Sequence, residues 1–333
     1  MKKLFFCIVA GCISMVAQSQ TVEAFHQSAN AFLLKEDYPN AFIVLNNGLQ
    51  SYPNHPLLNT DLAQYYYLQN DYPKAYSAIT TAIASDSAND QSYQIAGNIY
   101  KALNKATECE TLFTNALVKF PASGPLYNEM GSLLSDQKKN GAITYWEKGI
   151  QKDPSYPLNY YQAAKYYFSG SEFVWTILYG EIFVNMDPRN AKTPEIKNMI
   201  LQSYKKLLIN LSADKIANET NPFLKKYYTT FYHHREPAML GVTTAALTMI
   251  RTRFALEWQN NTADSLSFHL FDFHQQLLQE GLFEAYNQWM FGAAENLVSF
   301  QAWAQNHASA YENFVKYHKT FLFKMPLGQY YHP

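Results

Sequence analysis

The chain has 333 residues, of which 16% are aromatic and 16% charged, and its 26 basic side chains nearly balance its 27 acidic ones. This near-neutral charge, without any run of like charges, argues against a nucleic-acid partner. Length alone would suggest two ordinary domains, but internal repeats change that count.

The first 19 residues predict a secretory signal peptide. Lys2 and Lys3 precede an apolar run from Leu4 to Val16, and Ala17 and Ser19 place small side chains where a signal peptidase cleaves. This run is shorter than the roughly 20 residues that span a bilayer, so we expect no transmembrane segment in the mature chain. We therefore expect secretion across the inner membrane to the bacterial periplasm or cell envelope.

A second processing route remains open at Cys12. The segment Val9–Cys12 resembles a bacterial lipobox, in which the cysteine is lipidated. The apolar run continues from Ile13 to Val16, where a lipoprotein usually turns polar, so ordinary cleavage is favoured over a lipid anchor. Cleavage leaves Cys109 as a lone thiol, which cannot form an internal disulfide.

Small residues recur at intervals of 33 or 34 positions through the next part of the chain. One set is Ala29, Ala63, Gly97, Gly131 and Ala164, and a second is Ala41, Ala75, Cys109, Ala142 and Thr176. Two antiparallel helices about 8–10 Å apart can pack only where small residues meet. Each unit closes at Pro53, Ser87, Pro121, Pro154 or Pro188, and proline cannot continue a helix. The spacing predicts five helix hairpins over residues 20–190, roughly 21–55, 56–89, 90–123, 124–155 and 156–190.

This pattern resembles the tetratricopeptide repeat (TPR) family, whose 34-residue unit is a helix, a tight turn and a second helix. The resemblance implies an all-α fold in which the hairpins stack into a right-handed TPR-type α-solenoid that binds a protein or peptide. The fifth unit departs from the pattern, because Thr176, Gly180 and Phe183 replace the expected small, large and small residues. We expect its second helix to be rotated or shifted.

The first helices are expected to line the concave side of the solenoid. Their outward side chains form a polar, carboxamide-rich strip edged with aromatics, and its predicted peptide-binding members are His26, Asn30, Gln64, Tyr67, Gln94, Asn98, Lys101, Asn128, Tyr161 and Lys165. Carboxamides both donate and accept hydrogen bonds, so they can pair with the backbone of an extended peptide of any sequence. Most outer helix faces are merely solvated, but the carboxamides fall in register over four units. The resemblance implies that a set of basic residues in this strip binds a terminal carboxylate. Only Lys101 and Lys165 are basic among the strip residues, so we do not expect this mode of binding here.

Helical periodicity continues after Asn190 without the repeat. The predicted helices cover residues 194–211, 222–233, 237–258, 262–280, 282–291 and 295–321. A degenerate hairpin is predicted near 265–292, where Ala285, Trp289 and Gly292 copy the spacing of Ala142, Trp146 and Gly149. We interpret residues 191–333 as a helical capping region, which a solenoid needs at its end. A second binding domain is the alternative.

Two histidine clusters, one at His233, His234 and Glu236 and one at His269, Asp272 and His274, raise the question of a metal site. His269 and His274 would point about 140° apart on a helix, and no histidine pair has the spacing of an HExxH site. The sequence also lacks a phosphate loop, a GxSxG elbow and a CxxC pair. We therefore expect no catalytic residues, no metal and no cofactor.

Together these features predict a non-enzymatic scaffold of the bacterial cell envelope that binds an extended protein or peptide segment. One alternative is an enzyme whose site lies in residues 191–333. Another is a structural subunit of a multi-protein envelope complex, using the convex face or the aromatic tail Tyr330–Pro333.

Overall fold

The computed structural model describes residues 21–260 and 266–332, and helices connected by turns account for most of them, with no strand in these ranges. The predicted signal peptide and Cys12 lie outside the described residues. The described chain divides into two compact units, with the division between Lys105 and Ala106, and each is treated by itself below. The division falls within the third predicted hairpin.

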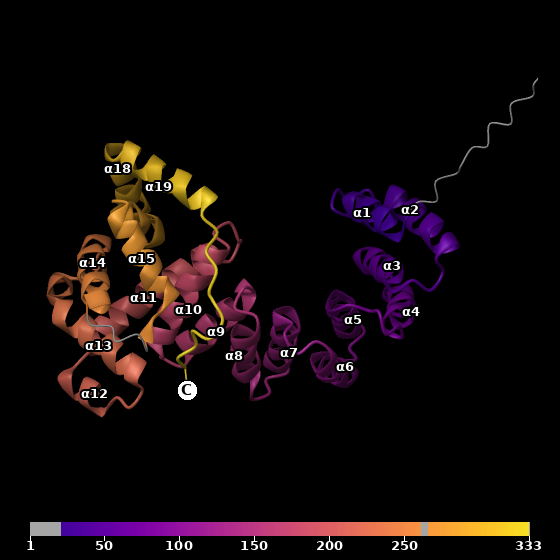
Figure 1. Ribbon diagram of the computed structural model, residues 1–333, viewed down its shortest axis with the longest axis horizontal. Coiled ribbons are helices and arrows are strands. Elements are labelled where there is room, and N and C mark those ends of the chain that lie inside the picture. Colours follow the sequence, from indigo (N-terminus) through magenta and orange to yellow (C-terminus); the bar gives the residue numbers. More distant parts are fainter. Residues whose placement is uncertain (1–20, 261–265, 333) are drawn as a thin grey trace, which may run out of the picture. The chain divides into compact units, whose positions relative to one another are not determined.

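Unit 1 is a stack of antiparallel helices (Figure 1). Its helices are α1 (Val22–Leu33), α2 (Tyr38–Ser51), α3 (Pro56–Leu68), α4 (Tyr72–Ile83) and α5 (Asp90–Ala102). The side chains of Thr21, Asp37 and Asp71 accept backbone N–H groups at the starts of α1, α2 and α4. Such caps satisfy donors that have no partner within the helix, so they fix where each helix begins.

The predicted small residues lie where the paired helices of unit 1 cross. Ala29, Ala41, Ala63 and Ala75 are completely buried. A Cβ added to Gly48 would approach the Phe25 ring to 3.0 Å. The second helices therefore pack so closely on the first ones that larger side chains at the crossings would push them apart.

Unit 2 begins with the same architecture. It contains α6 (Ala106–Lys119), α7 (Gly124–Asp136), α8 (Ala142–Lys152), α9 (Pro157–Ser169), α10 (Phe173–Met186) and α11 (Thr193–Asn210). A Cβ on Gly131 would lie 2.5 Å from Trp146 Nε1, so glycine there leaves room for the indole of the facing helix. Cys109 is buried at the position that alanine occupies in neighbouring repeats.

One backbone feature recurs at the turn inside every hairpin. A residue just after each first helix adopts a left-handed conformation with φ between 55° and 63°, at Glu36, Asn70, Asn104, Lys138 and Ser171. This conformation closes the turn by returning backbone N–H groups to the last helical carbonyls, as Asp37 N does to Phe32 O at 2.9 Å. Gly281, with φ 69°, repeats that turn between α15 (His269–Gln279) and α16 (Phe283–Asn287).

The fifth hairpin shows why its second helix departs from the pattern. Residues 174–185 of α10 are all buried, because α9 covers one side and α11 another. A Cβ on Gly180 would meet Ile200 at 2.9 Å and Ile196 at 3.0 Å. Glycine replaces the expected large residue because α11 continues the stack beyond the five predicted hairpins.

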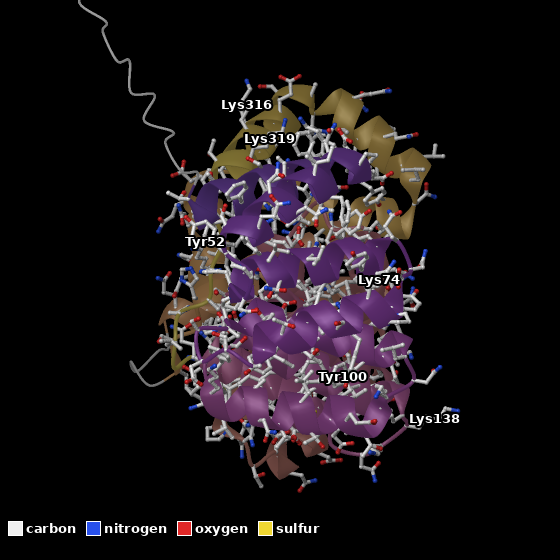
Figure 2. All side chains as sticks on the ribbon, turned by 90° about the vertical axis from the view of Figure 1, so that its right-hand side faces the viewer. Tyr52, Lys74, Tyr100, Lys138, Lys316 and Lys319 are labelled. Carbon is white, nitrogen blue, oxygen red and sulfur yellow. The ribbon has the colours of Figure 1, made fainter. Side chains whose placement is uncertain are left out.

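The remaining helices of unit 2 pack around α10 and α11. They are α12 (Ala213–Asn218), α13 (Pro222–His234), the 3-10 helix η1 (Glu236–Leu240), α14 (Thr244–Asn260), α15, α16, the π-helix η3 (Gln288–Gly292), α17 (Ala293–Glu295), α18 (Leu297–Asn306) and α19 (Ala308–Thr320). Lys316 and Lys319 lie on α19, as Figure 2 shows.

Four predicted boundaries in this region are wrong. The α-helix predicted over 262–280 begins, within the described residues, only at His269. The predicted helix 237–258 is interrupted by an extended turn at Gly241 (φ 132°) before α14 begins. The predicted helix 295–321 breaks at His307 (φ −120°), giving α18 and α19. The predicted helix 282–291 changes from α to π geometry after Asn287.

The last described residues form an extended tail that returns from α19 across unit 2 (Figure 1). The Tyr331 ring stacks on Phe223 with centroids 4.6 Å apart. His332 lies against the Tyr167 hydroxyl at 2.9 Å and the Glu147 carboxyl at 3.1 Å. The tail therefore packs against α8, α9 and α13, including two helices of the repeat stack.

Candidate binding surface

In unit 1 the predicted strip begins at the seam between the first helices α1 and α3. His26 Nδ1 lies 2.8 Å from Asp61 Oδ2, and the Asn30 amide lies 3.0 Å from the same histidine nitrogen. The His26–Asp61 contact joins neighbouring repeats, whereas the Asn30–His26 contact lies within α1. His26 and Asn30 thus help to hold the first helices together, and Asp61 is the partner that sequence analysis missed.

The environment of Asp61 opposes its ionisation. The side chain is 1% exposed, and its Oδ1 has no hydrogen-bond partner among the described residues. Burial raises the pKa of Asp61 to about 6, although hydrogen bonding and charge from His26 act in the opposite direction. The carboxyl at this seam therefore titrates close to neutral pH.

Farther along the strip, α3 carries the carboxamide Gln64, and α5 carries Gln94 and Asn98. The seam itself is closed by Thr60 and Ser92, whose hydroxyl oxygens lie 2.8 Å apart. Gln64 Oε1 has no partner among the described residues. The Gln94 and Asn98 side chains on α5 are half-buried.

Aromatic and basic members of the strip flank these carboxamides in sequence. The Tyr67 ring packs on Tyr72 with centroids 5.7 Å apart, near the turn into α4. Lys101 lies half-buried in the last turn of α5. On the second helices, Lys74 of α4 (labelled in Figure 2) is an exposed residue that pairs with Asp71 at 2.7 Å.

In unit 2 the structure places the predicted residues differently. Asn128 on α7 is 5% exposed and Tyr161 on α9 is 4% exposed, so neither side chain faces outward as expected. The Tyr161 hydroxyl donates to Glu195 on α11 at 3.0 Å and accepts from Lys165 at 3.1 Å. A hydrogen bond to Tyr161 is the main cause that raises the pKa of Lys165. These three side chains link α9 to α11, and their polar atoms bind one another.

A buried charged cluster lies elsewhere in unit 2. Glu181 on α10 accepts hydrogen bonds from Arg251 on α14, from the Tyr286 hydroxyl at 2.7 Å, and from His274 Nε2 at 2.8 Å. Each of these side chains is at most 3% exposed. Asn287 completes the set by accepting from Arg251.

Electrostatics keep this cluster ionised. Burial opposes the charge on Glu181, but Arg251 and His274 outweigh it and lower the pKa of the carboxyl to about 2. Burial also acts against Arg251, whose pKa is nevertheless raised by Glu181. Burial lowers the pKa of His274, whereas the neighbouring Glu181 carboxyl acts in the opposite direction. The cluster is a packed structural centre that joins α10 to α14, α15 and α16.

The described residues contain no group of histidine, cysteine, aspartate and glutamate side chains arranged to hold a metal ion. Over the same residues, no helix combines the length and apolar character needed to cross a bilayer. His233 and His234 instead pair with Glu257, at 2.9 and 2.7 Å.

Stacked hairpins, small crossing residues and recurrent left-handed turns define a helical repeat protein. Similar solved structures include pilF of Pseudomonas aeruginosa, which is 16% identical, with 72% of this chain and 97% of that chain covered and a TM-score of 0.49. A TPR protein of Thermus thermophilus is 13% identical over 55% of this chain and 99% of its own, with a TM-score of 0.46.

The carboxy-terminal part of a TPR repeat-containing protein from Cytophaga hutchinsonii is 15% identical, with 81% of this chain and 95% of that chain covered and a TM-score of 0.41. No protein-family model matches the sequence, and no curated protein matches it. The assignment of the fold therefore rests on the geometry of the hairpins themselves.

Proposed function

We propose that this protein is a non-enzymatic scaffold of the bacterial cell envelope that holds an extended protein or peptide segment along the first-helix face of its repeats. The envelope location in this proposal is supported by the signal-peptide pattern at the amino terminus. The binding mode is supported by the polar strip of unit 1.

The observation that carries the proposal is the unpaired amide oxygen of Gln64 on α3, together with the carboxamides of α5 that continue the strip. Gln64 Oε1 is buried without a partner among the described residues, and Gln94 and Asn98 lie half-buried on the next first helix. The buried Gln64 oxygen therefore lacks a hydrogen bond that it would make in water. An extended backbone supplies alternating N–H and C=O groups, so it can satisfy these amides without a particular sequence.

The geometry of unit 2 favours the scaffold over the enzyme alternative. Its converging titratable side chains, Glu181, Arg251 and His274, are sealed in the core. A pocket of about 570 Å³ beside α11 is lined by no histidine, aspartate, glutamate or cysteine. General acid–base chemistry needs a titratable group within reach of substrate. In the described residues the cluster and this pocket do not coincide, and Lys197 is the one lining side chain of the pocket that exchanges its proton near neutral pH.

A peptide-display selection against the purified chain tests the proposed binding mode. Peptides that it enriches should bind the double variant Gln64→Ala with Asn98→Ala about 10-fold or more weakly, since each lost hydrogen bond is worth about 1 kcal/mol. Fluorescence anisotropy with a labelled peptide gives both dissociation constants.

The matched control removes two carboxamides from a second helix. Asn46 and Asn47 are exposed on α2, so Asn46→Ala with Asn47→Ala should leave peptide affinity unchanged. Equal affinities for the unmodified chain and the Gln64/Asn98 double variant would contradict the proposal.

A further inference from the structure

A pocket of about 570 Å³ lies in unit 2 beside the first turns of α11. One wall is the turn that precedes α11, with Arg189 and Asn190, and the opposite wall is formed by η3 and α17. This volume falls within the range of about 300–1,000 Å³ that is typical of small-molecule sites. It is large enough to hold a ligand and not merely a few waters.

The wall contributed by η3 has unusual backbone geometry. Residues Gln288–Gly292 form a single π-helical turn, and Trp289 and Met290 of that turn line the pocket. Single π turns within α-helices are rare and are often found at functional sites. Here the wide turn presents an indole and a thioether to the cavity.

Lys197 is the charged group that faces this wall. Its Nζ lies 3.4 Å from the centroid of the Trp289 ring and donates to the Trp289 carbonyl oxygen at 2.8 Å. No carboxylate of the described residues lies within ion-pair distance of it, whereas Lys165 on the neighbouring α9 pairs with Glu195 at 3.2 Å. Lys197 therefore has an aromatic face and a carbonyl dipole as partners but no counter-charge.

A desolvated ammonium without a counter-ion is costly. Burial lowers the pKa of Lys197 to about 7, so the amine loses its proton far more readily than an exposed lysine. A ligand that brought a negative charge to the amine would restore its protonated form. The remaining lining favours an anion, because Arg189 is the other ionisable side chain of the pocket.

We propose that this pocket binds a small organic anion, namely a carboxylate carried on a compact apolar body. The carboxylate lies against Lys197 and Arg189, with Asn198 as a neutral hydrogen-bonding group. The Asn190 amide is held by Asp187 at 2.8 Å and by Lys192 N at 3.0 Å. The apolar body packs on Trp289, Met290 and the two lining prolines. This site is separate from the first-helix strip of unit 1 and does not depend on peptide binding there.

Other titratable groups on the surrounding elements do not replace Lys197. His318 on α19 packs against Trp289 in a tilted arrangement with centroids 4.6 Å apart, and burial together with Lys197 lowers its pKa to about 4, so it is neutral near pH 7. Glu295 on α17 accepts from Thr244 N, and Glu284 on α16 accepts from the Trp303 indole. Glu195 on α11 is held by Lys165 and Tyr161.

Calorimetric titration of the full chain with 4-phenylbutanoate and with its neutral amide tests the proposal. The acid should bind at least 10-fold more tightly than the amide. Binding near pH 7.5 should take up protons, because the carboxylate raises the pKa of Lys197, and titrations in two buffers of different ionisation enthalpy measure that uptake.

Lys197→Met should abolish both the preference for the acid and the proton uptake. Lys226→Met is the matched control, since Lys226 also lies over an indole, 4.3 Å from the Trp258 centroid, but outside this pocket. It should bind the acid as the unmodified chain does. Should Lys197→Met fail to fold, as judged by circular dichroism, Arg189→Met serves instead and should weaken the acid several-fold while leaving the amide unchanged.

The proposal is overturned if the acid does not bind, if acid and amide bind equally, or if a folded Lys197→Met variant keeps the preference. Loss of the acid preference in Lys226→Met to the same extent would also overturn it.

Discussion

At the scale of single residues, the pair His26–Asp61 combines a structural role with a position on the proposed binding face. The two side chains come from first helices one repeat apart and meet at 2.8 Å. Because Asp61 is buried, its carboxyl prefers the neutral form in the folded state more than in the unfolded state. Stability of unit 1 should therefore depend on pH through this residue.

The sign of that dependence follows from the raised pKa. The contribution of Asp61 is fully present below the unfolded pKa of about 3.9 and is lost as pH rises through the folded value of about 6. Replacement Asp61→Asn keeps the shape and can accept a hydrogen bond from His26, but it cannot ionise. We expect Asp61→Asn to raise the free energy of unfolding by about 1–3 kcal/mol at pH 7.5.

Chemical denaturation at pH 7.5 and at pH 4 measures this difference. At pH 4 the folded carboxyl is already protonated, so the gain should nearly vanish. Asp37→Asn provides a control, because Asp37 is a half-buried helix cap. A gain for Asp61→Asn of the same size at both pH values would contradict the account of Asp61.

Sequence reasoning selected several residues of the strip but not their partners. The periodicity placed His26 and Asn30 on a first helix, yet it gave no sign that Asp61 lies between them and the next repeat. Asn128 and Tyr161 share the register of the outward residues but are buried. For Tyr161 the reason is α11, a helix beyond the predicted repeats that supplies Glu195.

At the scale of helices, the spacing of small residues predicted which elements pair and where they cross. The crossings are steric, so Ala29, Ala63 and Gly131 carry that information locally. Helix ends in the capping region depend on distant contacts, and this is why the breaks at Gly241 and His307 were not predicted. The π turn η3 was not predicted for the same reason, since its surroundings include the distant helix α11 as well as α17.

The cluster around Glu181 is the element-scale feature that sequence analysis missed. A single charge within the apolar segment 174–184 and Arg251 within α14 were the available signals. Neither predicts the other, because they lie 70 residues apart. Their meeting fixes α14 and α15 against α10 in one orientation.

Removing one partner from this cluster should strongly destabilise unit 2. Arg251→Met leaves the Glu181 carboxylate buried without its main counter-charge, and we expect a loss of about 3–5 kcal/mol in the free energy of unfolding. Thermal and chemical denaturation followed by circular dichroism measure it. The exposed neighbour Arg253 provides the control, since Arg253→Met should change stability by less than about 0.5 kcal/mol.

A double variant separates the charge effect from lost packing. Adding Glu181→Gln to Arg251→Met removes the unpaired charge, so part of the lost stability should return. Stability of Arg251→Met equal to that of the unmodified chain would show that the cluster does not hold the capping helices as described.

At the scale of the whole molecule, the repeat determines the fold class and the tail adds long-range contacts. The 34-residue period was sufficient to predict stacked hairpins, because each repeat buries its faces mainly against its neighbours. The capping region instead depends on pairs such as Asn185 with Tyr286, separated by 101 residues. The contact of His332 with Tyr167 spans 165 residues. No local pattern encodes such pairs.

The central claim is that the first helices of unit 1 hold an extended peptide. Cross-linking tests it most directly, with a display-selected peptide that carries a benzophenone at successive positions and mass spectrometry to map the attached residues. Cross-links should fall on α1, α3 and α5, around Asn30, Gln64 and Asn98, and should advance along the helices as the benzophenone is moved. Cross-links confined to α2 and α4, or scattered without order over both faces, would contradict the claim.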